Sequence, residues 1–210
     1  MTIKNRILVT LCHEGPASRA ELAKRLDLSA SHISEAVNEL LEKEILVESG
    51  YRQDNSRGRK STLLNFNVSY RFALGLGFAD NIMSIGLTTV TGEVLGKEVT
   101  TIDPHLTKDE LFDIAMKMVM GILRNCCLTM SSLLGIGLCV KQTAARRYYV
   151  DASLEEIIAD VHQYTKQKIV FEPAEEYLQA DPKIASISRE ELYLFGAAKV
   201  VRDLFLYADI

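Results

Sequence analysis

Tryptophan is absent from this chain, and proline and cysteine are scarce. Its 210 residues include four prolines and four cysteines. Because the cysteines lack the spacing of metal ligands, we expect free thiols in a reducing compartment rather than disulfides or a zinc site. The N-terminus has no signal-peptide pattern, and no apolar run approaches the roughly 18 residues that cross a membrane. These absences predict a cytoplasmic protein with no membrane partner.

An excess of charge of one sign is also missing. The formal net charge is −4, which by itself does not indicate nucleic-acid binding. Residues 1–67 hold ten Lys and Arg against nine Asp and Glu, whereas the remaining residues hold 14 against 19. The four histidines are scattered, so no nucleophile, base and orienting acid can be assigned. We therefore expect no enzymatic activity, no cofactor and no metal, and two parts of different charge.

A helical pattern near the N-terminus is the strongest feature that is present. Four apolar residues repeat at i, i+4, i+7 and i+8, which is the period of one helix face. They are Ile33, Val37, Leu40 and Leu41. Ser29 precedes them in the position of an N-cap. The spacing predicts an amphipathic helix that begins at Ser29 and buries one face.

Two shorter helical runs precede this helix. Residues 3–12 form the first, and a Gly-Pro pair follows it. The second covers residues 18–26, with Ser18 as its cap and a capping-box glutamate three residues later. Only Asp27 and Leu28 separate it from the amphipathic helix. Two helices joined by so short a turn are typical of the helix-turn-helix, which presents its second helix to the major groove of DNA.

Polar side chains occupy the opposite face of the amphipathic helix. At about 100° per residue, the positions away from the apolar stripe include Ser31, His32, Glu35 and Asn38. We expect Ser31 and Ser34 to donate to phosphates or base edges. His32 and Asn38 are expected to read bases, and Glu35 to accept a hydrogen bond from cytosine N4. Acidic residues farther along predict that only the N-terminal half enters the groove. The alternative is an ordinary solvated surface.

A strand, a basic loop and a returning strand follow this helix. Residues 45–49 and 61–67 have strand patterns, and eleven polar residues lie between them. The loop holds four basic residues against one Asp, a local charge of +3. Beside a helix-turn-helix, such a hairpin predicts a wing that contacts phosphates or the minor groove, with a solvated loop as the alternative. The predicted DNA-binding residues are Arg19, Ser29, Ser31, His32, Ser34, Glu35, Asn38, Arg57, Arg59 and Lys60.

Beyond residue 70 the pattern predicts layers of helices and strands. The expected strands cover residues 72–78, 82–90, 94–102, 134–140 and 169–171, and the expected helices cover 111–126, 154–164 and 189–200. Thr91 and Gly92 mark a hairpin between the second and third strands. The Gly-x-Gly pairs at 75–77 and 135–137 fit tight packing better than phosphate binding. The last apolar run, 204–207, is expected to begin a further strand.

Several of these segments resemble the ROK family of transcriptional repressors. The similarity to the winged-helix region of that family lies in residues 5–8, 15–23, 28–34, 57–60 and 64–67. The beginning of its sugar-kinase-like domain is similar to residues 72–78 and 91–95. The resemblance implies an α/β protein with a winged helix-turn-helix DNA-binding domain, 1–67, and a single partial actin-like (RNase H-like) α/β lobe, 68–210. It also implies a DNA-binding transcriptional regulator, which we expect to be a homodimeric repressor.

The lobe departs from the kinases of this family at their functional positions. Residues 77–81 replace their Asp-x-Gly-Gly-Thr phosphate loop, Lys141 and Gln142 replace a Pro-Gly pair, and residues 171–175 replace an Asn-Asp pair. The family's zinc-binding cluster and most of its second lobe are expected beyond Ile210. The resemblance therefore implies a lobe without kinase activity, which dimerises or senses an unidentified small-molecule effector.

Two other functions are alternatives at this point. The first is a small-molecule sensor or kinase-like protein whose winged helix mediates protein interaction. The second is a truncated, non-functional regulator whose ligand site needs residues that are absent. A steep dependence of duplex binding on salt, with a slope of roughly 0.9 per neutralised phosphate, separates a DNA reader from the first alternative. The thermal stability of the lone lobe tests the second, because a severed fold should expose an apolar surface or oligomerise to cover it.

Overall fold

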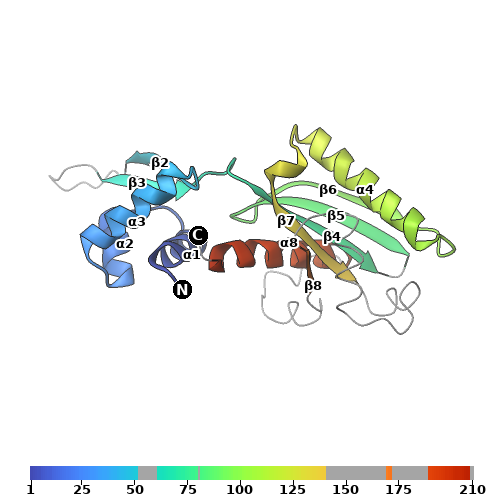
Figure 1. The fold of residues 1–210 in the computed structure, drawn as a ribbon, viewed down its shortest axis with the longest axis horizontal. Coiled ribbons are helices and arrows are strands. Elements are labelled where there is room, and N and C mark those ends of the chain that lie inside the picture. Colours follow the sequence, from blue (N-terminus) through green and yellow to red (C-terminus); the bar gives the residue numbers. More distant parts are fainter. Residues whose placement is uncertain (52–60, 80, 141–168, 172–188, 209–210) are drawn as a thin grey trace. The chain divides into compact units, whose positions relative to one another are not determined.

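The chain forms two compact units. The computed structural model describes residues 1–51, 61–79, 81–140, 169–171 and 189–208. Unit 1 combines Met1–Tyr70 with the last residues of the chain, from Leu204 onward, and unit 2 is Arg71–Asp203. Figure 1 shows the helices and strands of each unit.

Three capped helices make up most of unit 1. They are α1 (Ile3–Glu14), α2 (Arg19–Leu26) and α3 (Ala30–Glu42). Each begins at a hydroxyl side chain, because Thr2, Ser18 and Ser29 accept hydrogen bonds from N–H groups of the first turn that have no partner inside the helix. The capping box predicted at Ser18 is present, with the Glu21 carboxylate 2.8 Å from Ser18 N. The three predicted helices are thus confirmed, and α1 is two residues longer than expected.

A small antiparallel sheet completes unit 1. Its strands are β1 (Ala17–Ser18), β2 (Leu46–Tyr51) and β3 (Thr62–Phe66), in the order β1-β3-β2. Apolar side chains from the helices and the sheet fill the space between them. The fully buried residues include Ile7, Leu8, Leu22, Ile33, Val37, Leu40, Ile45 and Leu64. Burial of each such side chain contributes about 1.5–3 kcal/mol, so the core holds the polar face of α3 outward.

The end of helix α8 (Arg189–Tyr207) also belongs to unit 1. Leu206 is buried, and the ring centroid of Phe205 lies 5.9 Å from that of Tyr70. The side chain of Asn5, fully buried in α1, donates from Nδ2 to the carbonyl of Leu206 at 2.9 Å and also to that of Ala208. The last carbonyls of a helix lack partners within the helix, and Asn5 supplies donors to this end.

Unit 2 contains a mixed five-stranded sheet. Its strands are β4 (Phe72–Ala79), β5 (Ile82–Thr89), β6 (Val94–Thr101), β7 (Leu133–Val140) and β8 (Ile169–Phe171), in the order β6-β5-β4-β7-β8. The first three form an antiparallel meander, whereas β7 pairs parallel to β4 and β8 parallel to β7. Gly92 adopts a φ of 91° in the β5–β6 turn, which confirms the hairpin predicted there.

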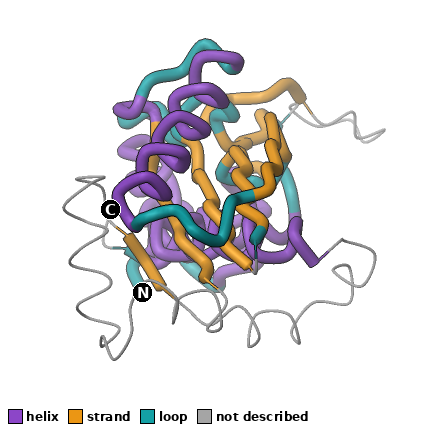
Figure 2. Tube along the Cα trace, turned by 90° about the vertical axis from the view of Figure 1, so that its right-hand side faces the viewer, coloured by secondary structure: helices purple, strands orange, loops and turns teal. Residues whose placement is uncertain are grey.

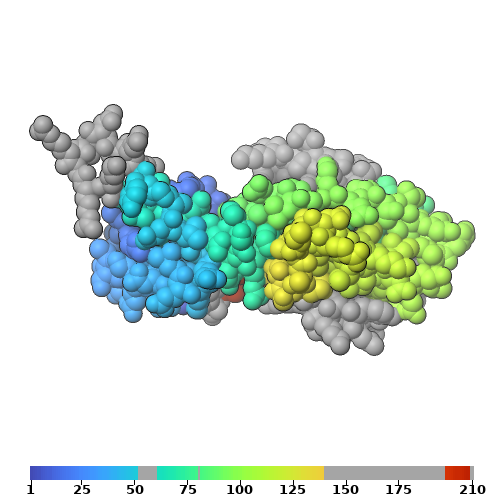
Figure 3. Space-filling view, turned by 90° about the horizontal axis from the view of Figure 1, so that it is seen from above, coloured from blue at the N-terminus to red at the C-terminus, as the bar shows by residue number. Residues whose placement is uncertain are grey.

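Helix α4 (Lys108–Asn125) covers one face of this sheet (Figure 2). Large apolar side chains that alternate along the strands, such as Phe72, Leu74 and Ile85, pack in one buried cluster with Val119 and Ile122 of α4. In the space-filling view the yellow-green atoms of α4 form a broad surface of unit 2 (Figure 3). A short 3-10 helix, η1 (Met130–Ser132), precedes β7.

Small side chains allow α8 to pack on the opposite face of the sheet. Ala73 of β4 clusters with Ala198 and Val201 of α8. A Cβ atom added to Gly137 of β7 would lie 2.0 Å from the carbonyl oxygen of Ala197. The glycine at 137 therefore permits close helix packing, in agreement with the interpretation of the Gly-x-Gly pairs as packing features.

One predicted element is wrong. The apolar run 204–207 was expected to begin a strand, but it forms the last turn of α8. Leu206 is buried and Phe205 half-buried within unit 1, so packing outweighs the strand preference of aromatic and branched side chains. The helix expected at 154–164 and the replaced kinase positions 141–142 and 172–175 lie outside the described residues.

Candidate nucleic-acid interface

The turn between α2 and α3 sets the direction of α3. Asp27 ends α2 in the left-handed conformation, with a φ of 53°. Its N–H and that of Leu28 both donate to the carbonyl of Ala23, so this carbonyl in the last turn of α2 gains two partners from the turn. Ser29 then caps α3. The two-residue turn predicted between the helices is present.

The face of α3 that carries the predicted DNA-binding residues is open to solvent. Ser31, His32, Glu35 and Asn38 are exposed, and Ser34 is half-buried. The opposite stripe is buried, as Ile33 and Val37 have no accessible surface. The division of α3 into a buried apolar face and an exposed polar face is as predicted, and the exposed face is the one that a major groove could receive.

Ser29 and His32 form a local pair at the start of α3. The Oγ atom of Ser29 accepts from the backbone N–H of His32 at 3.3 Å and lies 3.0 Å from Nδ1 of the His32 ring. The lone hydroxyl proton can be donated to Nδ1, and a neutral imidazole then carries its own proton on Nε2. Ser29 thus serves as the cap and also orients the ring of His32.

Arg19 connects three elements of unit 1. Its Nη1 atom lies 3.0 Å from Oε1 of Glu48 in β2, and its Nη2 atom lies 3.4 Å from Oδ1 of Asn38 in α3. The side chains of Arg19 and Glu48 are 32% and 50% exposed. Arg19 was predicted to bind DNA, but Glu48 was not singled out, because a separation of 29 positions in the sequence follows no helical or strand period.

Acidic side chains lie toward the C-terminal half of α3. Glu39 pairs with Lys4 of α1, with Nζ and Oε2 3.0 Å apart. Glu42 is exposed. Negative charge at this end opposes contact with phosphates, whereas the first turn offers backbone N–H groups and the positive end of the helix dipole. The distribution favours the N-terminal half of α3 as the part that approaches DNA.

The two strands of the predicted wing are paired. Leu46 lies opposite Phe66 and Tyr51 opposite Thr62, with an irregularity in register between Glu48 and Tyr51. Tyr51, at the end of β2, is 63% exposed. The basic residues Arg57, Arg59 and Lys60 lie outside the described residues. The strands of the hairpin are therefore confirmed, and the contacts of its basic loop stay a prediction.

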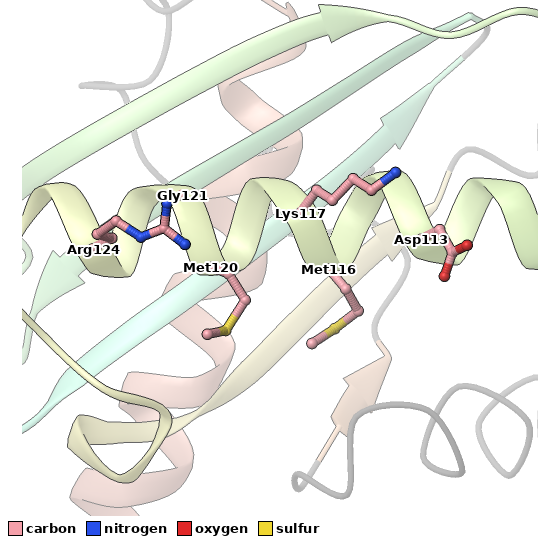
Figure 4. A pocket seen from close by; sticks show the side chains of 6 residues that line it. All are labelled: Asp113, Met116, Lys117, Met120, Gly121 and Arg124. Carbon is pink, nitrogen blue, oxygen red and sulfur yellow. The ribbon is translucent and has the colours of Figure 1, made fainter.

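Unit 2 offers less evidence of a chemical site. Within the described residues, no three His, Cys, Asp or Glu side chains come close enough to hold a metal ion. A shallow pocket on the outer surface of α4 is lined by Asp113, Met116, Lys117, Met120, Gly121 and Arg124 (Figure 4). These residues all belong to a single helix, so they form an open surface rather than a cleft between elements. No described helix is long and apolar enough to cross a membrane.

Comparisons with known proteins agree with this arrangement. Residues 2–47 match a family model described as winged helix-turn-helix DNA-binding. The xylose repressor of Caldicellulosiruptor bescii is 26% identical over 136 residues, which are 64% of this chain and 34% of the repressor. A putative xylose repressor of Caldicellulosiruptor sp. (strain Rt8B.4) is 25% identical over 132 residues, or 63% of this chain and 33% of that protein. The chain thus spans about a third of these relatives.

A solved structure shares the fold. It is a ROK family transcriptional regulator, described as a homologue of the E. coli MLC protein, with a TM-score of 0.56 and 18% sequence identity. The similarity covers 79% of this chain and 43% of that one. The predicted fold class, a winged helix-turn-helix followed by an α/β lobe, is confirmed. The chain therefore combines a winged helix-turn-helix with the fold of a ROK-family regulator, and is similar in sequence to the xylose repressors.

Proposed function

We propose that this chain is a DNA-binding transcriptional regulator that acts as a repressor and has no enzymatic activity. The observation that carries the proposal is the exposed polar face of α3, from Ser31 to Asn38, on a helix whose opposite face is buried in a winged helix-turn-helix core. The N-terminal half of α3 enters the major groove, and the basic loop of the hairpin contacts phosphates. The similarity to repressors supports the same assignment.

The DNA-contacting residues fall into two groups in this proposal. Ser31 and Ser34 bind phosphates or base edges, and His32, Glu35 and Asn38 face the bases. Arg57, Arg59 and Lys60 neutralise phosphates. Ser29 acts as the cap that starts the helix and holds His32. Arg19 lies beside this surface, with its guanidinium 3.4 Å from Oδ1 of Asn38.

Unit 2 supplies assembly and sensing in this proposal. A homodimer places two α3 helices one turn of DNA apart, at about 34 Å, so the operator is a palindrome. The same lobe binds an unidentified small-molecule effector. Because two relatives are named xylose repressors, xylose is the first compound to test by its effect on the melting temperature.

Salt dependence of binding to duplex DNA tests the proposal. Binding sites are first selected from a random duplex library, and the affinity for the enriched site is then measured as salt is varied. We expect a palindrome with half-sites one helical turn apart. Combined Arg57→Ala, Arg59→Ala and Lys60→Ala should reduce the log-log slope by about 0.9 for each residue that contacts a phosphate.

A matched variant controls for the loss of charge. Combined Lys97→Ala, Lys117→Ala and Arg124→Ala removes three positive charges from exposed positions of unit 2 and should leave the slope nearly unchanged. No enriched sequence, or equal slopes for the two triple variants, would contradict the proposed reader and its wing.

A further inference from the structure

A network of three side chains controls how Asn38 is presented at the exposed face of α3. We infer that Arg19 is a positioning residue, which holds the Asn38 amide so that only its N–H donors face DNA and thereby favours guanine over adenine at the base that Asn38 reads. The inference rests on the proposed function, because it assigns the specificity of the same surface. It assigns Arg19 an orienting role in place of direct DNA contact.

The orientation of the Asn38 amide follows from the chemistry of its partner. A guanidinium has only donors, so Arg19 Nη2 at 3.4 Å can bond the amide oxygen of Asn38 but not its nitrogen. With Oδ1 turned toward Arg19, the Nδ2 group is on the other side of the planar amide. Asn38 is exposed and makes no other hydrogen bond within the described part of the chain. Its two N–H donors are therefore available to an external acceptor.

Glu48 fixes the guanidinium in turn. Its carboxylate lies 3.0 Å from Nη1 of Arg19, so Arg19 is held from one side by β2 while its other nitrogen reaches α3. An exposed ion pair of this kind adds little stability. Its effect here is orientation, and it also neutralises the charge that Arg19 would otherwise direct at a phosphate.

The two purines respond differently to such an amide. Asparagine reads adenine with both ends, because the oxygen accepts from N6 and the nitrogen donates to N7. The amide oxygen has a second lone pair, but an oxygen directed at Arg19 is turned away from the base, so Nδ2 is the group that meets it, and its donors would face the N6 amino group of adenine. Guanine presents two acceptors, O6 and N7, in the same groove. A donor-only Asn38 therefore selects guanine.

The ring of His32 is held by Ser29 through Nδ1 at 3.0 Å. When the Ser29 hydroxyl is the donor of this bond, the ring carries its proton on Nε2 and offers an N–H donor to DNA. Glu35, an acceptor, lies between His32 and Asn38 at intervals of three residues and is exposed like both. With His32 in that tautomer, the stripe reads donor, acceptor, donor along the helix, which is complementary to G·C pairs with guanine acceptors and a cytosine N4 donor.

Site selection with four proteins tests the inference. The proteins are the wild type, Asn38→Ala, Arg19→Met and Arg25→Met. Arg25 is the matched control, because it lies on the same helix, is 31% exposed and pairs with Glu14 at 3.0 Å rather than with α3. Equal melting temperatures establish that each variant is folded.

We expect the wild type to enrich guanine at one position per half-site, and Asn38→Ala to lose that preference. Arg19→Met should shift the ratio of guanine to adenine at this position toward adenine by at least about fivefold, because the freed amide can turn. Arg25→Met should keep the wild-type ratio. Replacing that guanine by 7-deazaguanine should weaken binding of the wild type but not of Asn38→Ala.

Three results would overturn the inference. Adenine enriched by the wild type at the Asn38-dependent position is one, and an unchanged base ratio in Arg19→Met is another. Both leave the proposed function intact, since a sequence is still selected. The third is the absence of any enriched sequence in all four proteins, which also removes the proposed function.

Discussion

Asn5 carries a polar contact in the core of unit 1. Its Nδ2 group donates to the carbonyls of Leu206 and Ala208, and its Oδ1 atom accepts from the backbone N–H of Thr2 at 3.1 Å. A buried carbonyl left without a donor costs about 1–3 kcal/mol. Asn5→Asp keeps the acceptor but removes the donor, and should lower the free energy of unfolding by at least that amount in urea titrations. Equal stability of Asn5→Asp and the wild type would show that the donor contributes nothing.

Gly137 tests the packing of α8 against the sheet. A methyl group at this position would meet the backbone of Ala197, with its oxygen at 2.0 Å and its Cα at 3.1 Å. Because backbone rather than a flexible side chain blocks the space, Gly137→Ala should lower the stability by about 1–3 kcal/mol. Gly121→Ala is the control, because Gly121 lies in helix α4 and a Cβ atom added there would meet nothing within 4 Å. The free energy of unfolding of that variant, measured by thermal unfolding, should exceed that of the wild type by up to about 1 kcal/mol.

Glu110 makes the stability of unit 2 depend on pH. Hydrogen bonds from the backbone and side chain of Thr107 lower the pKa of the Glu110 carboxyl, because they stabilise the charged form. A lowered pKa in the folded state contributes stability above the unfolded pKa, and this stability is lost as the pH falls through the folded pKa. Glu110→Gln should therefore flatten the acid limb of a plot of stability against pH. An acid limb identical to that of the wild type would mean that the cap does not contribute.

The helices of unit 1 could be predicted because their signals are local. Ser18, Ser29 and the apolar repeat of α3 each act within one or two turns, and the structure places all three as expected. The ion pair of Arg19 and Glu48 could not be predicted, since it depends on how β2 packs beside α2. The end of α8 was misread for a similar reason, because Leu206 is buried and its carbonyl accepts from Asn5, a residue 201 positions earlier in the sequence.

Helix α3 as an element supports a prediction about His32. The ring is held at the first turn by Ser29, where the helix approaches the groove most closely in the proposed function. His32→Ala should relax the base preference at one position per half-site by about 1–3 kcal/mol. Competition between duplexes that differ at single positions measures this directly. A uniform loss of affinity for every duplex would reassign His32 to phosphate contact.

On the scale of the whole molecule, unit 1 is made of two separate segments of the chain. The first segment ends at Tyr70, the chain then forms the sheet of unit 2, and the second segment begins at Leu204, near the end of α8. A division of the sequence into one N-terminal and one C-terminal domain therefore does not describe unit 1, which contains residues from both ends of the chain. A boundary near residue 67 was predicted because the hairpin strand ends there, and no local signal marks the return of the last residues.

This return limits how the protein can be recombined with others. A chimeric repressor made by joining residues 1–70 to a foreign sensor would lose Leu206 and Phe205 from the core of its own DNA-binding part, and would leave the Asn5 amide without its acceptors. Supplying the last helical turn as a separate peptide, or grafting it onto the new partner's final helix, should restore the missing packing. The transplantable module is thus two pieces of sequence rather than one.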